Sequence, residues 1–321
     1  MGRIYKIGYA YFPSALSSIF SPKIRIDVHG VESHFDNIGA RGGGFSLVEG
    51  CETWVKIDED EENETEVVVN DSIKYFPPSL EAAEEMRRRF NITGKIEIRH
   101  RIHVPLATGF GSSASSIAGT VLALSTLTGH DLTLRGILKI THEIELKCRT
   151  GLNSEAGFIT GGLVLVLREG APPKTIVDSI PLPQDIKLVA LVARSMKTSE
   201  VISDFSKIEY IEEVGDKFLS RILKKPTPQN FLTCAKEFAY EAGFVTSRVE
   251  EMFEVLRRLP IVGYAQNMLG EAAHTLIYER DLEYVLKELR DYFQNERIVV
   301  SDLTSTCNVS SKQIVLEKSV S

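Results

Sequence analysis

The chain has 321 residues, of which 43% are hydrophobic and 25% are charged. These proportions are those of an ordinary globular protein, and the length allows two domains or one large one. The formal net charge of −7 argues against a general nucleic-acid-binding protein, because phosphate binding needs a basic surface. It leaves room for a local basic pocket that receives a small anion.

Cysteine spacing and hydropathy restrict the setting further. The four cysteines are far apart and form no C-x-x-C pair: Cys51, Cys148, Cys234 and Cys307. A zinc site or a redox motif is therefore not expected, and the pattern favours a reducing compartment. No apolar run has the length of a membrane span, and the first residues lack the apolar block of a signal peptide. We therefore expect a cytoplasmic protein without a membrane partner.

The N-terminal segment is rich in turn-forming residues. Short strands and turns are predicted for residues 1–57, because Pro13, Pro22 and a glycine cluster at 39–44 interrupt the apolar pattern. The acidic tract at 58–66 is predicted to be a solvated loop, since it lacks the spaced oxygens and the glycine of a calcium loop.

A helix, a strand and two further helices are predicted next. Residues 79–90 suit a helix that is capped by Ser79, and the alternating pattern of 95–104 predicts a half-buried strand. Residues 112–127 and 133–148 have the apolar spacing of two helices, which a short turn joins.

The second half of the chain is predicted to begin near residue 184, where proline-rich turns favour a domain boundary. Apolar runs at 161–167 and 186–193 predict buried strands. Helices are predicted at 199–223, 228–243, 246–258 and 281–293. A small-residue strand-to-helix turn is predicted at 263–274, and a last strand at 297–300. The mixture favours an α+β fold with domains at 1–184 and 185–321.

The loop at residues 104–119 contains two glycines, a run of hydroxyl residues and then an apolar helix pattern. A Walker P-loop is excluded, because no lysine follows the second glycine. The G-x-G-x-x-A spacing of residues 109–114 matches a dinucleotide-binding fingerprint, but the preceding strand is amphipathic, whereas that motif follows a strand buried on both faces. Two interpretations remain: a plain glycine turn with serine caps, or a phosphate-binding loop in which helix amides, Ser112 and Ser113 face the ligand.

A resemblance favours the phosphate-binding interpretation. Residues 105–115, P-L-A-T-G-F-G-S-S-A-S, resemble the P-x-x-x-G-[LF]-G-S-S-A-A signature of the GHMP kinases. Further segments resemble archaeal pantoate kinases and occur in the expected order: 39–47, 141–152, 161–172, 197–204 and 265–270. The resemblance implies a ribosomal S5-like N-terminal ATP-binding domain and a ferredoxin-like C-terminal domain, with ATP and substrate between them.

The resemblance also implies roles for individual residues. The ATP phosphates would be held by Pro105, Gly109, Gly111, Ser112, Ser113 and Ala114. Ser113 and Glu145 would bind Mg²⁺ and act in catalysis, which suits phosphoryl transfer because that reaction depends on positioning and charge neutralisation. Without the resemblance, Glu145 would be interpreted as an exposed helix residue paired with Arg149.

Four residues are candidates for binding the substrate. His142 matches a histidine implicated in pantoate binding in the family, and Arg41 could hold the pantoate carboxylate in a bidentate contact. Arg168 and Thr198 are further candidates of the same kind. The alternatives are a histidine on a helix surface and a loop arginine in water.

Three positions depart from the family pattern. Ser154 stands where the T-G-L-G-D stretch has its aspartate, Ala40 replaces the serine of G-S-R-G, and residues 13–17 lack the histidine of P-[GA]-H-I-T. Glu155 is a candidate catalytic replacement for the aspartate, one residue further along. Alternatively, transfer proceeds without a base, because a largely dissociative transition state asks little of one.

We therefore predict an ATP- and Mg²⁺-dependent kinase that phosphorylates the terminal hydroxyl of pantoate in coenzyme A biosynthesis. The alternatives are a GHMP kinase for another small hydroxy acid or polyol, and a non-catalytic homologue that binds a nucleotide or metabolite. The expected partner is a small hydroxy acid and no nucleic acid, and assembly into a homodimer is left open.

Overall fold

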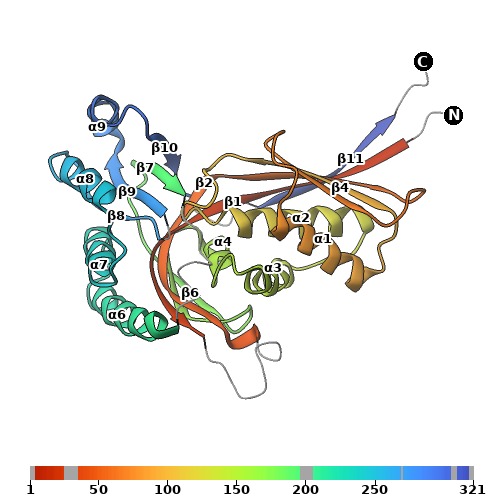
Figure 1. Cartoon of the computed structure of the whole chain (residues 1–321), viewed down its shortest axis with the longest axis horizontal. Helices are drawn as coiled ribbons and strands as arrows, with labels where there is room; N and C mark the ends of the chain where they lie inside the picture. The colour runs from red at the N-terminus through yellow and green to blue at the C-terminus, as the bar shows by residue number, and fades with distance from the viewer. Residues whose placement is uncertain (1–3, 25–34, 196–204, 269, 305–308, 318–321) are drawn as a thin grey trace.

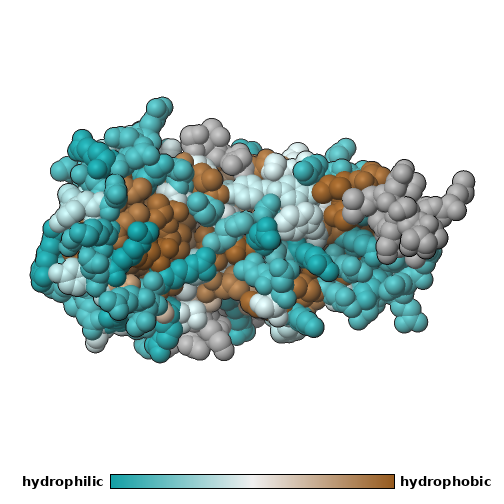
Figure 2. All heavy atoms as spheres, turned by 90° about the horizontal axis from the view of Figure 1, so that it is seen from above, coloured by the Kyte–Doolittle hydropathy of each residue, from teal (hydrophilic) through white to brown (hydrophobic). Residues whose placement is uncertain are grey.

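The computed structural model describes residues 4–24, 35–195, 205–268, 270–304 and 309–317. Helices α1–α3 lie along one face of a long sheet, and helices α6–α9 lie around a smaller sheet at the other end of an elongated molecule (Figure 1). Helices and mainly antiparallel sheets confirm the predicted α+β class. Seen from above, the surface is mostly hydrophilic, with separate apolar patches (Figure 2). Within the described ranges, no helix has the length and apolar character needed to cross a membrane.

Seven strands form the first sheet, in which β5 and β6 are attached beside the row β11-β1-β2-β4-β3. β1 and β2 contain 20 residues each and pair antiparallel along nearly their whole length. The strands are β1 (Ile4–Lys23), β2 (Gly39–Asp58), β3 (Thr65–Val69), β4 (Lys95–Ile102), β5 (Gly162–Arg168), β6 (Ile176–Ile180) and β11 (Ser310–Glu317). Residues 59–64 are exposed as predicted, whereas the predicted loop begins with Asp58, which is buried at the end of β2, and its last residues, from Thr65, join β3.

The prediction of short strands and turns for residues 1–57 was wrong, because the turn-forming residues lie inside the long β1–β2 pair. Pro13 lies next to a register shift, where the ladder is already interrupted and a missing N–H donor costs little. Within β2, Gly42 has φ +147°, and a Cβ there would lie 2.1 Å from the Ile19 carbonyl oxygen. The glycines therefore allow two strands to approach closely and do not end them.

Three helices cover the first sheet within two residues of their predicted bounds: α1 (Pro77–Phe90), α2 (Ser112–Thr128) and α3 (Leu134–Cys148). The prediction that Ser79 caps α1 was wrong, because Phe76 occupies that position. Ser79 is buried instead, and its Oγ hydrogen bonds to His100 Nε2 at 2.8 Å. Ser79 therefore serves as the buried hydrogen-bond partner of His100 in β4.

The second sheet has the order β10-β7-β9-β8. Its elements are β7 (Ile186–Ser195), α6 (Phe205–Lys224), α7 (Pro228–Glu241), α8 (Ser247–Leu256), β8 (Gly263–Gln266), β9 (Gly270–Tyr278), α9 (Glu279–Tyr292) and β10 (Arg297–Asp302). The strand-to-helix turn predicted for 263–274 was wrong, because β8 and β9 pair as antiparallel strands. Ala272 and Ala273, neighbours on opposite faces of β9, are both fully buried, so the strand has no polar face to reveal it.

One hydrophobic core cluster extends across both sheets, and a further cluster packs β7 and β9 against α8 and α9. β11 returns to pair with β1, so the end of the chain completes the first sheet. The rings of Phe45 in β2 and Phe231 in α7 meet edge-to-face with centroids 5.6 Å apart, and both side chains are buried. Phe20 in β1 contacts Phe238 of α7 in the same way, at 5.8 Å. The aromatic contacts fix the second part of the chain against the β1–β2 pair.

We expect Phe231→Ala to lower the free energy of unfolding by about 3–5 kcal/mol, because it leaves a cavity between the two parts. Denaturant unfolding followed by circular dichroism measures this cost. Tyr292→Ala is the control, since Tyr292 is 57% exposed. Equal costs for the two variants would show that the Phe45–Phe231 contact does not hold the parts together.

Candidate active site

The glycine loop connects β4 to α2 and is fixed along β1. The backbone N–H of Ala15 donates to the Phe110 carbonyl at 3.1 Å, and that of Ser17 to the Gly109 carbonyl at 3.0 Å. Gly109 and Gly111 have φ +80° and +63°, the left-handed region that favours glycine. A Cβ on Gly111 would lie 2.8 Å from the Ala15 carbonyl oxygen. Substitution of Gly111 therefore strains the fold itself, whatever the loop binds.

A series of hydrogen bonds between buried polar side chains joins this loop to the β8–β9 hairpin. Asn267 donates from Nδ2 to the Thr108 carbonyl at 3.1 Å, and its Oδ1 accepts from His274 Nδ1 at 2.9 Å. Since Nδ1 of His274 is the donor, its Nε2 accepts from Ser18 Oγ at 2.9 Å. Burial lowers the pKa of His274 to about 3, which keeps the ring neutral. These hydrogen bonds fix the loop from the side of the second sheet.

A cavity opens beside the loop, between the β1–β2 pair and residues 150–154. Its hydroxyl-bearing lining includes Ser112, Ser113, Thr150 and Ser154. Arg41 is the one charged side chain among the described residues that line it. A cavity with hydroxyl groups, glycine backbone and a single guanidinium suits a small polar anion.

Glu145 lies beneath the start of α2 and is fully buried. Its Oε1 accepts a hydrogen bond from Ser113 Oγ at 3.0 Å, whereas its Oε2 has no partner among the described residues. Burial and the Glu155 carboxylate raise the pKa of Glu145 to about 8, and the Ser113 hydrogen bond and His142 only partly oppose this. Gly151 makes room for the carboxylate, since a Cβ there would lie 2.4 Å from Oε1.

Glu155 and His142 form a buried charge pair next to Glu145. His142 Nδ1 donates to Glu155 Oε1 at 2.8 Å, and His142 Nε2 donates to the Ile38 carbonyl at 2.9 Å. Burial would lower the pKa of His142, but Glu155 and the carbonyl outweigh it and raise the pKa to about 9. Asn153 donates from Nδ2 to the same Glu155 oxygen at 3.2 Å and accepts from the Ala40 N–H at 2.9 Å. The imidazolium thus ties the loop at 150–155 to the start of β2.

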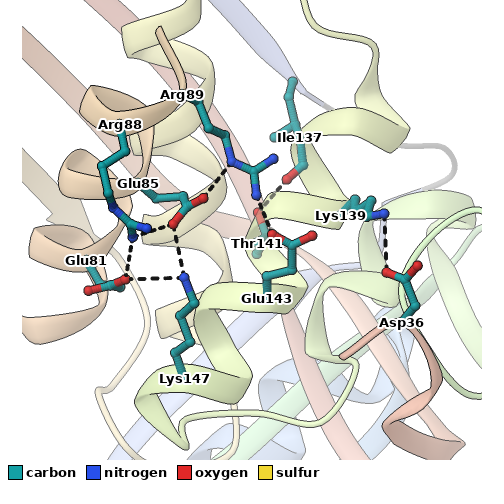
Figure 3. Close-up of polar contacts among 10 residues, drawn as sticks. All are labelled: Asp36, Glu81, Glu85, Arg88, Arg89, Ile137, Lys139, Thr141, Glu143 and Lys147. Atoms are coloured by element: carbon teal, nitrogen blue, oxygen red, sulfur yellow. Dashed lines mark hydrogen bonds and ion pairs between the residues drawn. The ribbon is translucent and has the colours of Figure 1, made fainter. Parts of the chain in front are cut away.

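Ion pairs on the outer side of α3 hold the helix that carries His142 and Glu145. Glu85 of α1 accepts from Arg89 at 2.7 Å and from Lys147 of α3 at 3.0 Å (Figure 3). Glu143 pairs with Arg89, and Lys139 with Asp36 at 3.2 Å (Figure 3). Glu85 is nearly buried, so its pairs lose less to solvent than exposed ones do. α3 is therefore braced on both sides of its buried acid.

A hard cation would find one carboxylate and one hydroxyl here. Among the described residues, no group of three or more His, Cys, Asp or Glu side chains could hold a metal alone. Mg²⁺ needs no such cage, because it keeps several waters and is bound through one or two carboxylates and substrate phosphates. Glu145 Oε2, which has no partner in the described part of the chain, and the neighbouring Ser113 hydroxyl fit that chemistry.

The remaining predicted residues lie in different places. Arg168 is exposed at the end of β5, where its Nε donates to the Lys174 carbonyl, and it is absent from the described lining of the cavity. His142 is fully buried behind that lining. Pro105 and Ala114 are buried at the two ends of the loop and support its backbone. Thr198 lies outside the described residues.

Two residues of the site were missed as candidates. Thr150 lines the cavity, and its Oγ1 is buried with no partner among the described residues. Asn153 occupies the second glycine position of the T-G-L-G-D pattern and has φ +89°. Asparagine tolerates this left-handed backbone better than most residues, which was the signal for a constrained position.

Comparisons with known proteins show what this chain is similar to. Residues 79–162, which include the glycine loop, α2 and α3, match the model of the GHMP kinases N terminal domain. The chain therefore resembles the GHMP kinases over this segment, as the loop signature predicted. Mevalonate kinase has the same fold, with a TM-score of 0.63 at 17% identity, over 94% of this chain and 99% of that one.

Particular proteins to which the chain is similar over most of its length are pantoate kinases. The chain is 26% identical to the pantoate kinase of Thermococcus kodakarensis over 288 residues, which cover 88% of this chain and 91% of that protein. It is 25% identical to the pantoate kinase of Methanospirillum hungatei over 283 residues, with 84% and 89% covered. A solved structure described as a phosphotransferase related to the CoA biosynthesis pathway has a TM-score of 0.80 at 22% identity, covering 97% and 99% of the two chains.

We expect Glu145 to make the stability of the protein fall with rising pH when no divalent cation is present. Its folded-state pKa of about 8 exceeds the ordinary value of 4.5, so its contribution is complete below about pH 4.5 and is lost as the pH rises through 8. Glu145→Gln removes this titration. Thermal unfolding in a chelator, from about pH 5 to about pH 8.5, should therefore show the variant gaining stability relative to the wild type. A constant difference would contradict a protonated Glu145 in the fold.

Proposed function

We propose that this chain is an ATP-dependent phosphotransferase that phosphorylates a hydroxyl group of a small hydroxy acid, with pantoate as the first candidate. The observation that carries the proposal is the Ser113–Glu145 hydrogen bond beneath the glycine loop, where one oxygen of a fully buried carboxylate has no described partner. A buried acid next to a helix start suits a site where phosphates and a cation meet.

The ATP phosphates are proposed to lie against the start of α2. The first N–H groups of this 17-residue helix have no intrahelical acceptor and form the positive end of its dipole. Gly109 and Gly111 let a ligand approach the backbone, and Ser112 and Ser113 add hydroxyl donors. We also propose that residues 1–184 form the ATP-binding domain and 185–321 the second domain, with β11 inserted into the first.

Mg²⁺ is proposed to be held by Ser113 and Glu145, where it would neutralise charge on the transferring phosphoryl group. Glu145 must then lose the proton that its raised pKa favours. The Ser113 hydroxyl already orients Oε1, so the carboxylate keeps one geometry before the ligand arrives.

Arg41 is proposed to bind the carboxylate of the acceptor substrate. It is the charged side chain among the described residues of the cavity lining, and a guanidinium pairs with a planar carboxylate in a bidentate manner. Such a contact favours a hydroxy acid over a neutral polyol. The similarity to pantoate kinases of two archaea supports the same substrate class.

Transfer is proposed to proceed without a general base. Ser154 lines the cavity where relatives are expected to carry an aspartate, and it is a poor base. Glu155 is fully buried, and one of its oxygens is occupied by His142 and Asn153. A largely dissociative transition state needs positioning and charge neutralisation more than proton removal. The same Ser154 favours the second candidate function, a non-catalytic homologue that binds nucleotide and metabolite.

A coupled ADP-release assay over a panel of hydroxy acids and polyols, including pantoate, tests the function. We expect turnover of pantoate, and we expect Glu145→Gln to lower kcat by roughly two to three orders of magnitude, because a charge-stabilising group is lost. Glu143→Gln is the control, since Glu143 lies on the same helix but pairs with Arg89 on the outer side. No ADP release from any acceptor would exclude the kinase, and near-normal turnover of Glu145→Gln would exclude its proposed role.

The missing aspartate gives a separate test of the chemistry. We expect Glu155→Gln to lower kcat by roughly tenfold or less, below the 10²–10⁴ of a lost general base. A larger loss in a variant with unchanged circular dichroism would identify Glu155 as the base. If the wild type is inactive and Ser154→Asp gains activity, the chain is a non-catalytic homologue.

A further inference from the structure

Arg41 is held from the side by a cluster of charged residues that belongs to both parts of the chain. Its Nη2 pairs with Asp216 of α6. The same carboxylate accepts from Ser21 Oγ at 2.6 Å and from Lys23 Nζ at 2.8 Å. Lys23 also pairs with Glu212 at 2.6 Å. The cluster joins β1, β2 and α6 next to the cavity.

The backbone of α6 is built to bring this carboxylate close. Gly215 precedes Asp216, and a Cβ on Gly215 would lie 2.5 Å from the Phe20 carbonyl oxygen. Glycine is unfavourable inside a helix, so its presence at residue 215 serves the close approach of α6 to β1. That approach places Asp216 opposite Ser21, which is itself the strand partner of Arg41.

The charges of the cluster balance so that Arg41 can still attract an anion. Lys23 and Arg41 carry two positive charges, and Glu212 and Asp216 carry two negative ones. Burial would raise the pKa of Asp216, but hydrogen bonds from Lys23, Ser21 and Arg41 lower it below its ordinary value, so the group is ionised. Because Asp216 also neutralises the nearly buried Lys23, it only partly neutralises Arg41.

Donors of the Arg41 guanidinium remain for a ligand. A guanidinium has five N–H groups, and the contact with Asp216 involves Nη2. The buried Nε–H of Arg41 has no partner among the described residues. The side chain is 30% exposed and lines the cavity, so without a lateral partner it could turn into solvent.

We propose that Asp216 is a positioning residue that holds Arg41 toward the cavity and so makes the site select acceptors with a carboxylate. This inference rests on the proposed function, in which Arg41 receives the acid group of a short hydroxy acid. It also means that acceptor selection depends on the second part of the chain, because the residue that orients Arg41 comes from α6.

The test measures binding apart from turnover. Isothermal titration with pantoate and with its neutral amide is made on the wild type, Asp216→Asn, Arg41→Gln and the double variant. We expect the wild type to prefer the acid, Asp216→Asn to weaken acid binding about tenfold with the amide unchanged, and the double variant to bind like Arg41→Gln. Glu213→Gln is the matched control, because Glu213 is an exposed acid on the same helix.

Several outcomes overturn the inference. If Asp216 only repelled the substrate, Asp216→Asn would bind the acid more tightly than the wild type does. Equal affinity of the two proteins for the acid would also refute the positioning role, and so would a wild type that binds the acid and the amide equally well. Should Asp216→Asn fold poorly, Ser21→Ala removes one hydrogen bond to Asp216 without a change of charge and should lower the preference for the acid partially. ADP release is measured separately: Asp216-dependent acid binding without turnover would refute the kinase and keep the inference, whereas turnover with unchanged selectivity in Asp216→Asn would refute the inference alone.

Discussion

A carboxyl group that is removed from water must be protonated, paired or bound to a cation, and Glu145 is removed from water completely. Among the described residues, Ser113 donates to one of its two oxygens, and the other has no partner. The neighbouring Glu155 further disfavours the ionised form of Glu145, because it is a second buried acid, whose own partner is the imidazolium of His142. Three titratable groups therefore have to be held in fixed positions behind a cavity that is open to a ligand.

Much of the surrounding structure holds these three groups in place. Gly151 leaves space for the acid, Asn153 bridges the loop to β2, and the ion pairs between α1 and α3 brace the helix from outside. The glycine loop is fixed separately, by backbone bonds to β1 and by the buried bonds of Asn267 and His274. The groups around the start of α2 are thus held in place before any ligand binds, which suits the phosphate site proposed there.

The sequence predicted local features well where a short pattern decides them. Helix α2 and the loop before it follow from glycines, serines and one apolar periodicity, and strand β4 from strict alternation. The β8–β9 hairpin and the long β1–β2 pair could not be predicted in this way, because their strands are buried on both faces or contain proline and glycine. Tertiary packing, and not local propensity, decides such segments. The cluster around Asp216 could not be predicted from local patterns either, because its members are nearly two hundred residues apart in sequence.

The loop at 150–155 shows how one residue of offset changes the chemistry of a site. Asn153 has a left-handed backbone and is bonded on both sides, so the direction of the residues after it is fixed. Ser154 consequently lines the cavity, whereas Glu155 turns inward to His142. The bonds that hold Glu155 would have to break before it reached a substrate, and for this reason the proposed transfer does not use it as a base. The carboxylate at 155 stabilises the histidine behind the cavity, and the groups that face the cavity include hydroxyl groups and the Arg41 guanidinium.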